Sequence, residues 1–386
     1  MAPLRIGVNA LYLLPGEVGG TEIYLRNLLD ALARIDSVNE YFVFTNRETG
    51  PDLVPGSGNF HLTPQAVRAA IRPLRIAWEQ TMLPLAAARK RLDALLNPGF
   101  TAPLLCPCPM VTVFHDMQHK RHPEHFRWFD LPFWRMLLYG SAKRSAELLA
   151  DSEATREDVL RFYRLDPAKV TTVTLGVEEE FFSIGKRRMR ATAPIKPSLQ
   201  PAIRSGHYML AVSTLHPHKN LDGLLLAFAA FLKTKPEYRL VVAGLRGFHS
   251  EALERLRASL GLEDSVRFTG WVPRTELYEL YAGAAAFVYP STFEGFGLPV
   301  VEALAAGVPT ACSNIQPLAG IAGDAALLFD PADAGQIAAA MERITSDDSV
   351  RERLTAAGPA QAARFSWIAT AERTLEAIAR VAHSGA

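Results

Sequence analysis

Apolar residues occur along the chain in short runs that alternate with segments of helical spacing. The first run, Leu4 to Ala10, leads into a loop with two adjacent glycines. The segment after this loop has apolar residues at every third or fourth position, namely Leu25, Leu28, Leu29, Leu32 and Ile35. Short apolar runs predict strands, and the longer spacing predicts an amphipathic helix. The N-terminal segment is therefore expected to fold as strand, loop and helix.

The same alternation continues to the end of the chain. Further strands are expected over residues 41–45, 110–114, 148–150, 170–174, 207–213, 239–243, 266–269 and 285–289. Helices are expected over residues 221–232 and 298–306, and from Ser366 as N-cap to the C-terminus. Strands that alternate with helices indicate parallel, doubly wound α/β sheets.

Residues 186–206 interrupt this alternation, because they are basic, rich in proline and without apolar periodicity. We predict that they link a first domain, residues 1–185, to a second domain, residues 207–365. The length of 386 residues agrees with two domains, since one core seldom organises so long a chain. Open α/β sheets bind ligands at the carboxyl ends of their strands, so we expect the site in a cleft between the two domains.

The composition bears on the possible partners and on the cellular location of the protein. Forty-one Lys and Arg residues against forty Asp and Glu residues give a formal net charge of +1, which argues against a nucleic-acid partner. The three cysteines lack the paired spacing of a zinc site or of a disulfide framework, so we expect a cytoplasmic location. No apolar run approaches the ~18 residues of a membrane span.

The strongest motif follows the expected strand 285–289 and reads STFEGFGLPVVEALAAGVP over residues 291–309. Its glycines allow close backbone approach to a ligand, and the free N–H groups of the following helix can hold a diphosphate. Glu294 and Glu302 can accept hydrogen bonds from sugar and ribose hydroxyls, respectively. The alternative is that Glu302 only complements the helix dipole and that Glu294 is a surface loop residue.

The two glutamates, separated by seven residues, resemble the signature of retaining glycosyltransferase family 4, and the resemblance extends over nearly the whole chain. It implies a GT-B fold, in which a C-terminal helix, here residues 366–386, crosses back to the first domain. In that family the first Glu contacts the donor sugar and the second binds the nucleotide ribose, which makes Glu294 catalytic and Glu302 donor-binding. The backbone between them touches sugar and phosphate, which implies donor contacts for Gly295, Phe296, Gly297 and Leu298.

The loop at residues 213–220, STLHPHKN, resembles the diphosphate-binding loop of the family. The resemblance assigns Thr214, His218 and Lys219 to the donor, with Lys219 also catalytic through its charge on the leaving group. The family commonly has Arg where His218 stands, and histidine is only partly charged near neutral pH. Arg246 is expected to assist Lys219, with a plain surface position as the alternative.

Four further positions resemble donor contacts of the family, and two others are expected to take part in catalysis and in acceptor binding. Gly19 and Gly20 resemble the glycine loop that approaches the donor phosphate, and Trp271 with Val272 resembles the base-binding loop, although Trp271 is alternatively a core residue. His115 resembles a histidine that lies near the transferred sugar, so we expect it to be catalytic. Asp116, which follows it, is expected to bind the acceptor.

Three histidines and a glutamate, His119, His122, Glu124 and His125, suggest a metal cluster at first sight. Their spacing around Pro123 does not place the ligands on one helical face, so we expect no metal there. The chain also lacks an Asp-x-Asp motif. We therefore expect neither a metal ion nor another cofactor.

The expected activity is transfer of a hexose from a nucleotide-diphosphate sugar to a hydroxyl of a glycan or lipid-linked glycan. The chain resembles bacterial mannosyltransferases of polysaccharide biosynthesis, so mannose from GDP-mannose is the first expectation and a UDP-sugar the second. The alternatives are a nucleotide-sugar epimerase or a phosphorylase on the same fold and, from another class, a bilobed sugar-binding protein.

Basic and apolar residues of the first domain also suggest contact with the inner face of the cell membrane or with a lipid-linked acceptor. Aromatic residues gather over residues 126–139. Core helices with solvated charges are the alternative. The basic residues are Arg68, Arg72, Arg75, Arg89, Lys90 and Arg91.

Overall fold

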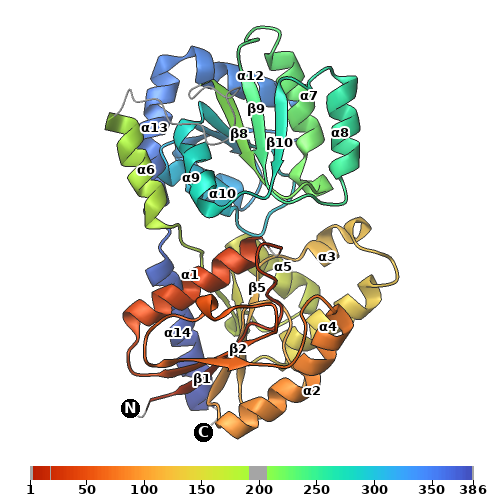
Figure 1. Ribbon diagram of the computed structural model, residues 1–386, viewed down its shortest axis with the longest axis vertical. Helices are drawn as coiled ribbons and strands as arrows, with labels where there is room; N and C mark the ends of the chain where they lie inside the picture. Colours follow the sequence, from red (N-terminus) through yellow and green to blue (C-terminus); the bar gives the residue numbers. More distant parts are fainter. Residues whose placement is uncertain (1–2, 18, 191–206, 385–386) are drawn as a thin grey trace. The chain divides into compact units, whose positions relative to one another are not determined.

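The computed structural model describes residues 3–17, 19–190 and 207–384 (Figure 1). Contacts divide the chain into two compact units, the first formed by Met1–Gly176 with Ser366–Ala386 and the second by Val177–Phe365. Each unit is built on one sheet whose paired strands are all parallel. The prediction of two doubly wound α/β domains is therefore confirmed.

The first unit has a sheet in the order β3-β2-β1-β4-β5-β6-β7. Its strands are β1 (Arg5–Asn9), β2 (Glu40–Thr45), β3 (Phe60–Pro64), β4 (Ala94–Asn97), β5 (Met110–Phe114), β6 (Glu147–Ala150) and β7 (Val170–Thr172). Its helices are α1 (Gly20–Ile35), α2 (Arg72–Lys90), α3 (Gln118–Arg121), α4 (Leu131–Arg144), α5 (Glu153–Tyr163) and α14 (Trp367–Ser384). The strand order reverses between β1 and β4, which is the place where such sheets bind ligands.

The last helix, α14, belongs to the first unit although the second unit precedes it in the sequence. Ser366 begins the helix as predicted, because its Oγ accepts a hydrogen bond from the backbone N of Ile368 at 3.2 Å. The helix packs on α1 and on strands β4, β5 and β6, where Ala371 and Ile378 are fully buried. The predicted return of the C-terminal helix to the first domain is confirmed.

The second unit has a sheet in the order β10-β9-β8-β11-β12-β13, which reverses between β8 and β11. Its strands are β8 (Tyr208–Val212), β9 (Arg239–Ala243), β10 (Val266–Gly270), β11 (Ala286–Tyr289), β12 (Thr310–Ser313) and β13 (Ala326–Phe329). Its helices are α6 (Glu179–Arg190), α7 (Leu221–Phe231), α8 (Ser250–Ser259), α9 (Arg274–Gly283), α10 (Leu298–Ala305), α11 (Leu318–Ala322), α12 (Ala334–Ser346) and α13 (Asp348–Ala362).

Strand β11 is buried on both faces of the second sheet. Its residues Ala286 and Val288 join the core cluster formed with α7 and α12. The alternate residues Phe287 and Tyr289 point to the opposite face, because side chains alternate along a strand. There the ring of Tyr281, from α9, stacks on Phe287 with 5.6 Å between ring centroids. Tyr289 is the last residue of β11 and therefore lies at the carboxyl end of the strand.

The boundary between the units differs from the prediction. Helix α6 was divided between the first domain, which was expected to end at residue 185, and the linker, but it belongs to the second unit. The reason is packing: Phe181 is fully buried, and its ring lies 5.1 Å from Tyr278 and 5.2 Å from Tyr281 of α9. Residues 186–190 of the predicted linker are helical, and residues 191–206 lie outside the described residues.

Candidate functional site

The loop after β11 ends in a glycine whose backbone conformation other residues rarely adopt. Gly297 has φ +121°, and a Cβ atom there would lie 2.4 Å from Cδ2 of Leu318. Pro299 stands in the first turn of α10, as predicted. Gly295 and Phe296 are buried and Leu298 is half-buried, and the Phe296 ring packs on Phe365 at 5.7 Å. Phe296 therefore anchors this loop by its side chain, which leaves its backbone for a ligand.

Glu294 and Lys219 meet at the carboxyl edge of the second sheet. The Nζ of Lys219 lies 2.6 Å from Oε1 of Glu294, and both side chains are largely buried. The hydroxyl of Tyr289 donates to the same oxygen at 2.8 Å. The loops that carry Lys219 and Glu294 follow β8 and β11, the two strands between which the sheet order reverses. The structure thus brings together two of the three predicted catalytic residues, Lys219 and Glu294.

Backbone contacts hold these two loops against each other. The carbonyl of His218 accepts hydrogen bonds from the backbone N of Thr292 at 2.8 Å and from Oγ of Ser291 at 2.9 Å. Asn220 adopts the left-handed conformation, with φ +51°, and its Nδ2 donates to the carbonyl of Pro290 at 3.1 Å. Thr214, earlier in the same loop, is half-buried. The position of Lys219 is therefore fixed by its neighbours.

Glu302 lies in the second turn of α10. Its side chain is buried. The Oε1 atom lies 2.6 Å from Nη2 of Arg274, and the Oε2 atom accepts from the hydroxyl of Tyr281 at 2.9 Å. Burial raises the pKa of Glu302 and Arg274 lowers it, and the net effect is a raised pKa. This carboxylate is held by two donors before any ligand binds.

Three partners of the two glutamates were not predicted from the sequence, namely Tyr289, Tyr281 and Arg274. The rings of Tyr281, Phe287 and Tyr289 form a continuous stack, with 5.6 Å and 5.8 Å between successive centroids. Each end of the stack donates a hydroxyl to one glutamate. The only sequence signal was the alternation Phe287, Tyr289 at the end of a strand. The stack connects the supports of both glutamates.

Two predicted donor residues lie at exposed positions. Arg246 forms an exposed ion pair with Glu254 of α8 at 3.3 Å, so the structure shows it at the surface, which was its alternative assignment. Trp271 is 57% exposed, so its alternative assignment as a core residue is wrong. Val272 is half-buried. The donor contacts of these three residues stay predictions.

In the first unit, Gly19 is the N-cap of α1 and Gly20 is its first residue. Gly19 has φ +58°, and a Cβ atom added at either glycine would meet no atom within 4 Å. Among the described residues, none therefore packs closely against the Cα atoms of these two glycines. The free N–H groups of a helix start favour an anion, in agreement with the predicted phosphate contact.

His115 follows β5 and has both ring nitrogens engaged. Its Nδ1 lies 2.7 Å from Oδ2 of Asp151, and its Nε2 lies 2.8 Å from the carbonyl oxygen of Pro98. Both partners are acceptors, so only the doubly protonated ring can donate to both. Burial alone lowers the pKa of His115, but the charge and hydrogen bond of Asp151 outweigh it and raise the pKa. The expected contact of His115 with the sugar stays a prediction.

The His115–Asp151 pair predicts a pH-dependent contribution to stability. Because its pKa is raised in the folded protein, this contribution is complete below the unfolded value near 6.5 and is lost as pH rises through the folded value. We expect Asp151→Asn to lower the free energy of unfolding by about 3 kcal/mol at pH 6, with a smaller difference above pH 8. Thermal unfolding of both proteins from pH 5.5 to 9 measures it. Asp222→Asn, which changes the more exposed pair Asp222–His249, is the control. A loss of unfolding free energy in Asp151→Asn that grows with pH would contradict the prediction.

The structure corrects one argument about metal binding. His122, Glu124 and His125 do come together, with one ligand atom from each within 4.8 Å of the others. The helical-face test did not apply, because Pro123 begins a 3-10 turn. His119 is turned away and bonds the hydroxyl of Tyr163 at 2.8 Å. Among the described residues no fourth donor joins the group, whereas structural zinc sites use four.

Asp116 lies beside His115 and is half-buried. Its Oδ1 accepts a hydrogen bond from the backbone N of Gln118 at 2.8 Å. This bond fixes the turn that leads from β5 into α3. The role of Asp116 in acceptor binding stays a prediction.

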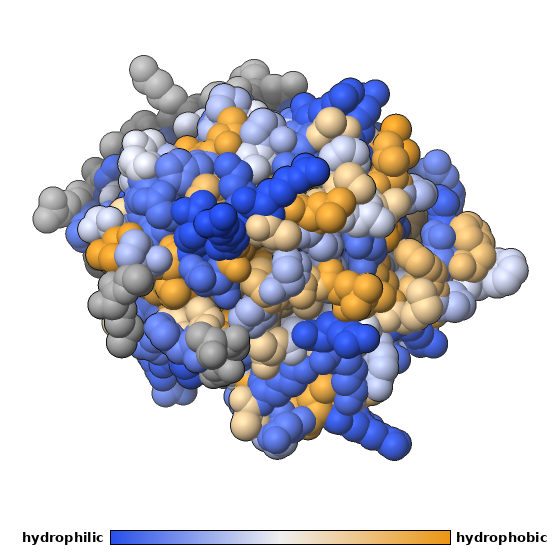
Figure 2. Space-filling model, turned by 90° about the horizontal axis from the view of Figure 1, so that it is seen from below, coloured by the Kyte–Doolittle hydropathy of each residue, from blue (hydrophilic) through white to orange (hydrophobic). Residues whose placement is uncertain are grey.

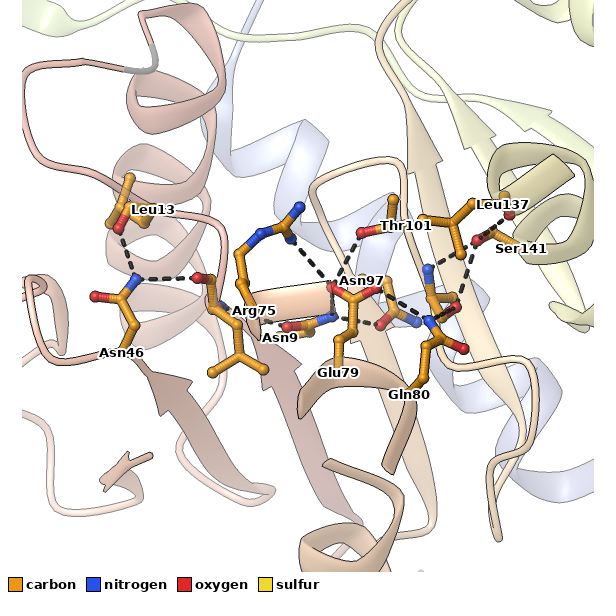
Figure 3. A network of polar contacts seen from close by, with 12 residues as sticks. Asn9, Leu13, Asn46, Arg75, Glu79, Gln80, Asn97, Thr101, Leu137 and Ser141 are labelled. Carbon is orange, nitrogen blue, oxygen red and sulfur yellow. Dashed lines mark hydrogen bonds and ion pairs between the residues drawn. The ribbon is translucent and has the colours of Figure 1, made fainter. Parts of the chain in front are cut away.

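A buried polar network lies where β1 and β4 end in the first unit (Figure 3). Oε2 of Glu79 accepts from Oγ1 of Thr101 at 3.0 Å and from Nδ2 of Asn9 at 3.3 Å, and Asn9 also donates to Oδ1 of Asn97 at 3.1 Å. Arg75 lies 3.4 Å from the same oxygen and is buried. Arg75 was counted among the basic residues of a membrane-facing surface, and its burial with Glu79 removes it from that group.

Comparison with known proteins agrees with this geometry. A family model described as "Glycosyltransferase Family 4" matches residues 18–181, and one described as "Glycosyl transferases group 1" matches residues 201–361. O-antigen chain mannosyltransferase B of Escherichia coli is 35% identical over 269 residues, which cover 69% of each protein. D-inositol 3-phosphate glycosyltransferase of Kribbella flavida is 32% identical over 94% of this chain and 91% of its own length.

Among solved structures, HepE of Anabaena in complex with UDP and glucose has the same fold. Its TM-score is 0.73 at 18% identity, and the match covers 97% of this chain and 99% of HepE. The arrangement of two parallel-sheet units with a returning C-terminal helix is thus that of GT-B glycosyltransferases. The protein belongs to glycosyltransferase family 4.

Proposed function

We propose that the protein transfers mannose from GDP-mannose to a hydroxyl of a glycan or lipid-linked glycan, with retention of configuration and without a metal ion. The observation that supports this most is the meeting of Lys219 and Glu294 on loops after β8 and β11, where the sheet order reverses. Ligands of open α/β sheets bind at such reversals. A cation for a diphosphate and a carboxylate for a sugar hydroxyl are thus available at one place.

In the proposed reaction, the acceptor oxygen bonds to the anomeric carbon on the face from which the diphosphate leaves. The acceptor proton passes to an oxygen of the departing diphosphate. Lys219, which pairs with Glu294 in this structure, then turns its charge to the diphosphate, and Glu294 accepts from a sugar hydroxyl.

The assignment of the donor sugar and of its nucleotide depends on similarity to other proteins. The mannose assignment follows the name of the Escherichia coli relative, an O-antigen chain mannosyltransferase. A UDP-sugar is the second candidate donor, because HepE binds UDP and glucose. Titration calorimetry of GDP, UDP and free mannose tests the proposal. We expect GDP to bind more tightly than UDP and both far more tightly than mannose, and tight binding of mannose alone would favour a sugar-binding protein.

We further propose that the first unit contacts an anionic membrane surface or lipid-linked acceptor. Among the described residues, no helix is both long and apolar enough to cross a bilayer, so the proposed contact is peripheral. Helices α2 and α4 touch where the guanidinium of Arg72 lies 3.9 Å from the centre of the Trp134 ring. Around them, large apolar side chains are exposed at Ile71, Leu74, Leu85, Trp128, Phe129, Phe133 and Met136.

The distribution of apolar and basic residues on the surface is compatible with a contact at the headgroup level of a bilayer. In the view of Figure 2, apolar residues form several separate patches between hydrophilic ones. Arg68, Arg72, Arg89 and Arg91 are exposed, and Lys90 is half-buried. Mixed basic and apolar surfaces of this kind bind at the headgroup level of anionic bilayers.

Sedimentation with vesicles tests this contact. We expect the protein to sediment with anionic vesicles at low salt, and the double substitution Trp128→Ser with Phe129→Ser to lower the bound fraction about tenfold. Trp128 is 83% exposed, so its loss should not disturb the core. Phe248→Ser, an exposed position in the second unit, is the matched control. Failure of the unchanged protein to sediment would exclude surface binding, but not a lipid-linked acceptor.

Treatment with a chelator tests the proposed metal independence. We expect EDTA to leave kcat/KM unchanged within about twofold, because Lys219 supplies the positive charge that a metal would give. His122→Asn serves as a check on the one histidine cluster described above. Activity that EDTA abolishes and Mg²⁺ or Mn²⁺ restores would contradict the prediction.

A further inference from the structure

Arg274, the first residue of α9, connects two carboxylates within the second unit. Its Nη2 lies 2.6 Å from Oε1 of Glu302 and 2.6 Å from Oε1 of Glu178. Its Nε lies 3.1 Å and 3.2 Å from the two oxygens of Glu178. The hydroxyl of Tyr278 also donates to Glu178. The guanidinium is thus fixed by Glu178 and presents one remaining contact to Glu302.

This arrangement differs from an ordinary surface ion pair. One guanidinium serves two carboxylates, and Glu302 is only 3% exposed. A buried carboxylate without its cation is costly, and two of them close together repel each other. Arg274 donates to one oxygen of Glu302 and Tyr281 to the other, and a carboxylate oxygen can accept more than one hydrogen bond. Ligand hydroxyls can therefore bind without displacing either donor.

We propose that Arg274 is a positioning residue, which holds the Glu302 carboxylate ionised and in one orientation for the ribose hydroxyls of the donor. Glu178 is the anchor of Arg274 in this role. The inference rests on the proposed function, because it takes a nucleotide sugar as the ligand of Glu302. It assigns to Arg274 a role in nucleotide affinity through Glu302, and not in the chemical step.

The titratable groups around Glu302 come from several elements. Helix α9 contributes Arg274 and Tyr281, the residue before α6 contributes Glu178, and Tyr289 of β11 responds to the charge of Glu302. On neighbouring helices, Arg187 of α6 pairs with Glu180, and on α13 Arg351 pairs with Asp348 and Arg353 bonds the carbonyl of Asp324. Arg274 is the cation that contacts both Glu302 and Glu178. We therefore expect its removal to favour protonation of Glu302.

Titration calorimetry with GDP and UDP from pH 6 to 9 tests the proposal. The Kd of the unchanged protein at each pH is the reference, because the terminal phosphate of the nucleotide itself titrates at about pH 6, and each pH profile is the ratio of a variant's Kd to this reference. Arg274→Gln should weaken binding about tenfold or more at pH 6 and recover part of it toward pH 9, as Glu302 ionises. Arg274→Lys, which keeps the charge but not the planar fork, should restore the flat profile with lower affinity. Arg257→Gln, which removes a half-buried arginine paired with Glu254, is the matched control and should behave as the unchanged protein.

The double variant Arg274→Gln with Glu302→Gln decides between positioning and mere structural support. Because glutamine does not titrate, the pH dependence should disappear in this variant. Persistence of the pH dependence there, or Arg274→Gln binding as tightly as the unchanged protein at every pH, would overturn the inference alone. If the unchanged protein binds neither GDP nor UDP, the proposed function fails and the inference fails with it.

Discussion

Replacement of Glu294 by Gln is expected to lower kcat by about 100-fold, while free nucleotide still binds. In the proposed site, Glu294 lies beside the sugar ring, where positive charge develops in the transition state. Gln preserves the shape but replaces a carboxylate oxygen by an NH₂ group, so the electrostatic contact is lost. Removal of one such contact typically costs a factor of about 10²–10³. Steady-state kinetics with GDP-mannose, together with calorimetry of GDP, separate the two effects.

Two other variants test whether the loss of kcat is due to the carboxylate of Glu294. Tyr289→Phe removes one donor to Glu294 but keeps its charge and its contact with Lys219, so we expect a smaller loss of kcat. Glu302→Gln should instead raise KM for the donor more than it lowers kcat, because ribose binding is similar in the ground state and the transition state. A near-normal kcat for Glu294→Gln would show that its assigned role is wrong.

Replacement of Lys219 by Ala is expected to weaken GDP binding by about 10- to 150-fold. This range corresponds to about 1.5–3 kcal/mol, the usual contribution of a hydrogen bond to a charged group. The loss of affinity has two sources. The diphosphate loses the positive charge of Lys219, and it is also repelled by Glu294, whose carboxylate Lys219 contacts at 2.6 Å in the unchanged protein. Calorimetry with GDP and with guanosine, which has no phosphate, isolates the diphosphate contribution.

Two controls accompany Lys219→Ala. Lys233→Ala removes an exposed lysine of the same unit and should leave the affinity unchanged. Arg246→Ala removes the residue that was expected to assist Lys219, but Arg246 is paired with Glu254 at the surface, so we expect less than a threefold effect. Equal losses of affinity for GDP and for guanosine in Lys219→Ala would contradict the assignment of Lys219 to the diphosphate.

The sequence predicted those parts of the fold and site that depend on local pattern. The loop with Glu294 and the helix with Glu302 were placed from the strand, the glycines and the proline around them, and α10 begins where expected. The strands missed were short: β3 has five residues, and β4, β12 and β13 have four residues each. An apolar run of this length cannot be assigned by periodicity, because it fits a buried helix segment equally well.

The supports of the two glutamates could not be predicted, because they are contacts between distant segments. Arg274 bonds Glu178 across 96 residues and Glu302 across 28 residues, and neither spacing has a local signature. His122, Glu124 and His125 were judged by helical spacing, although Pro123 starts a different kind of turn. Local rules therefore identified the residues that are proposed to face the ligand but not the residues that contact and position them.

Acceptor-dependent release of nucleotide tests the central proposal most directly. The purified protein is incubated with GDP-mannose or with each of a panel of UDP-sugars, with and without a glycan or lipid-linked glycan acceptor, and free nucleotide is measured. We predict GDP release that requires the acceptor, survives EDTA and falls about 100-fold in Glu294→Gln. No nucleotide release from any donor, together with tight binding of free mannose, would contradict the proposal and identify a sugar-binding protein instead.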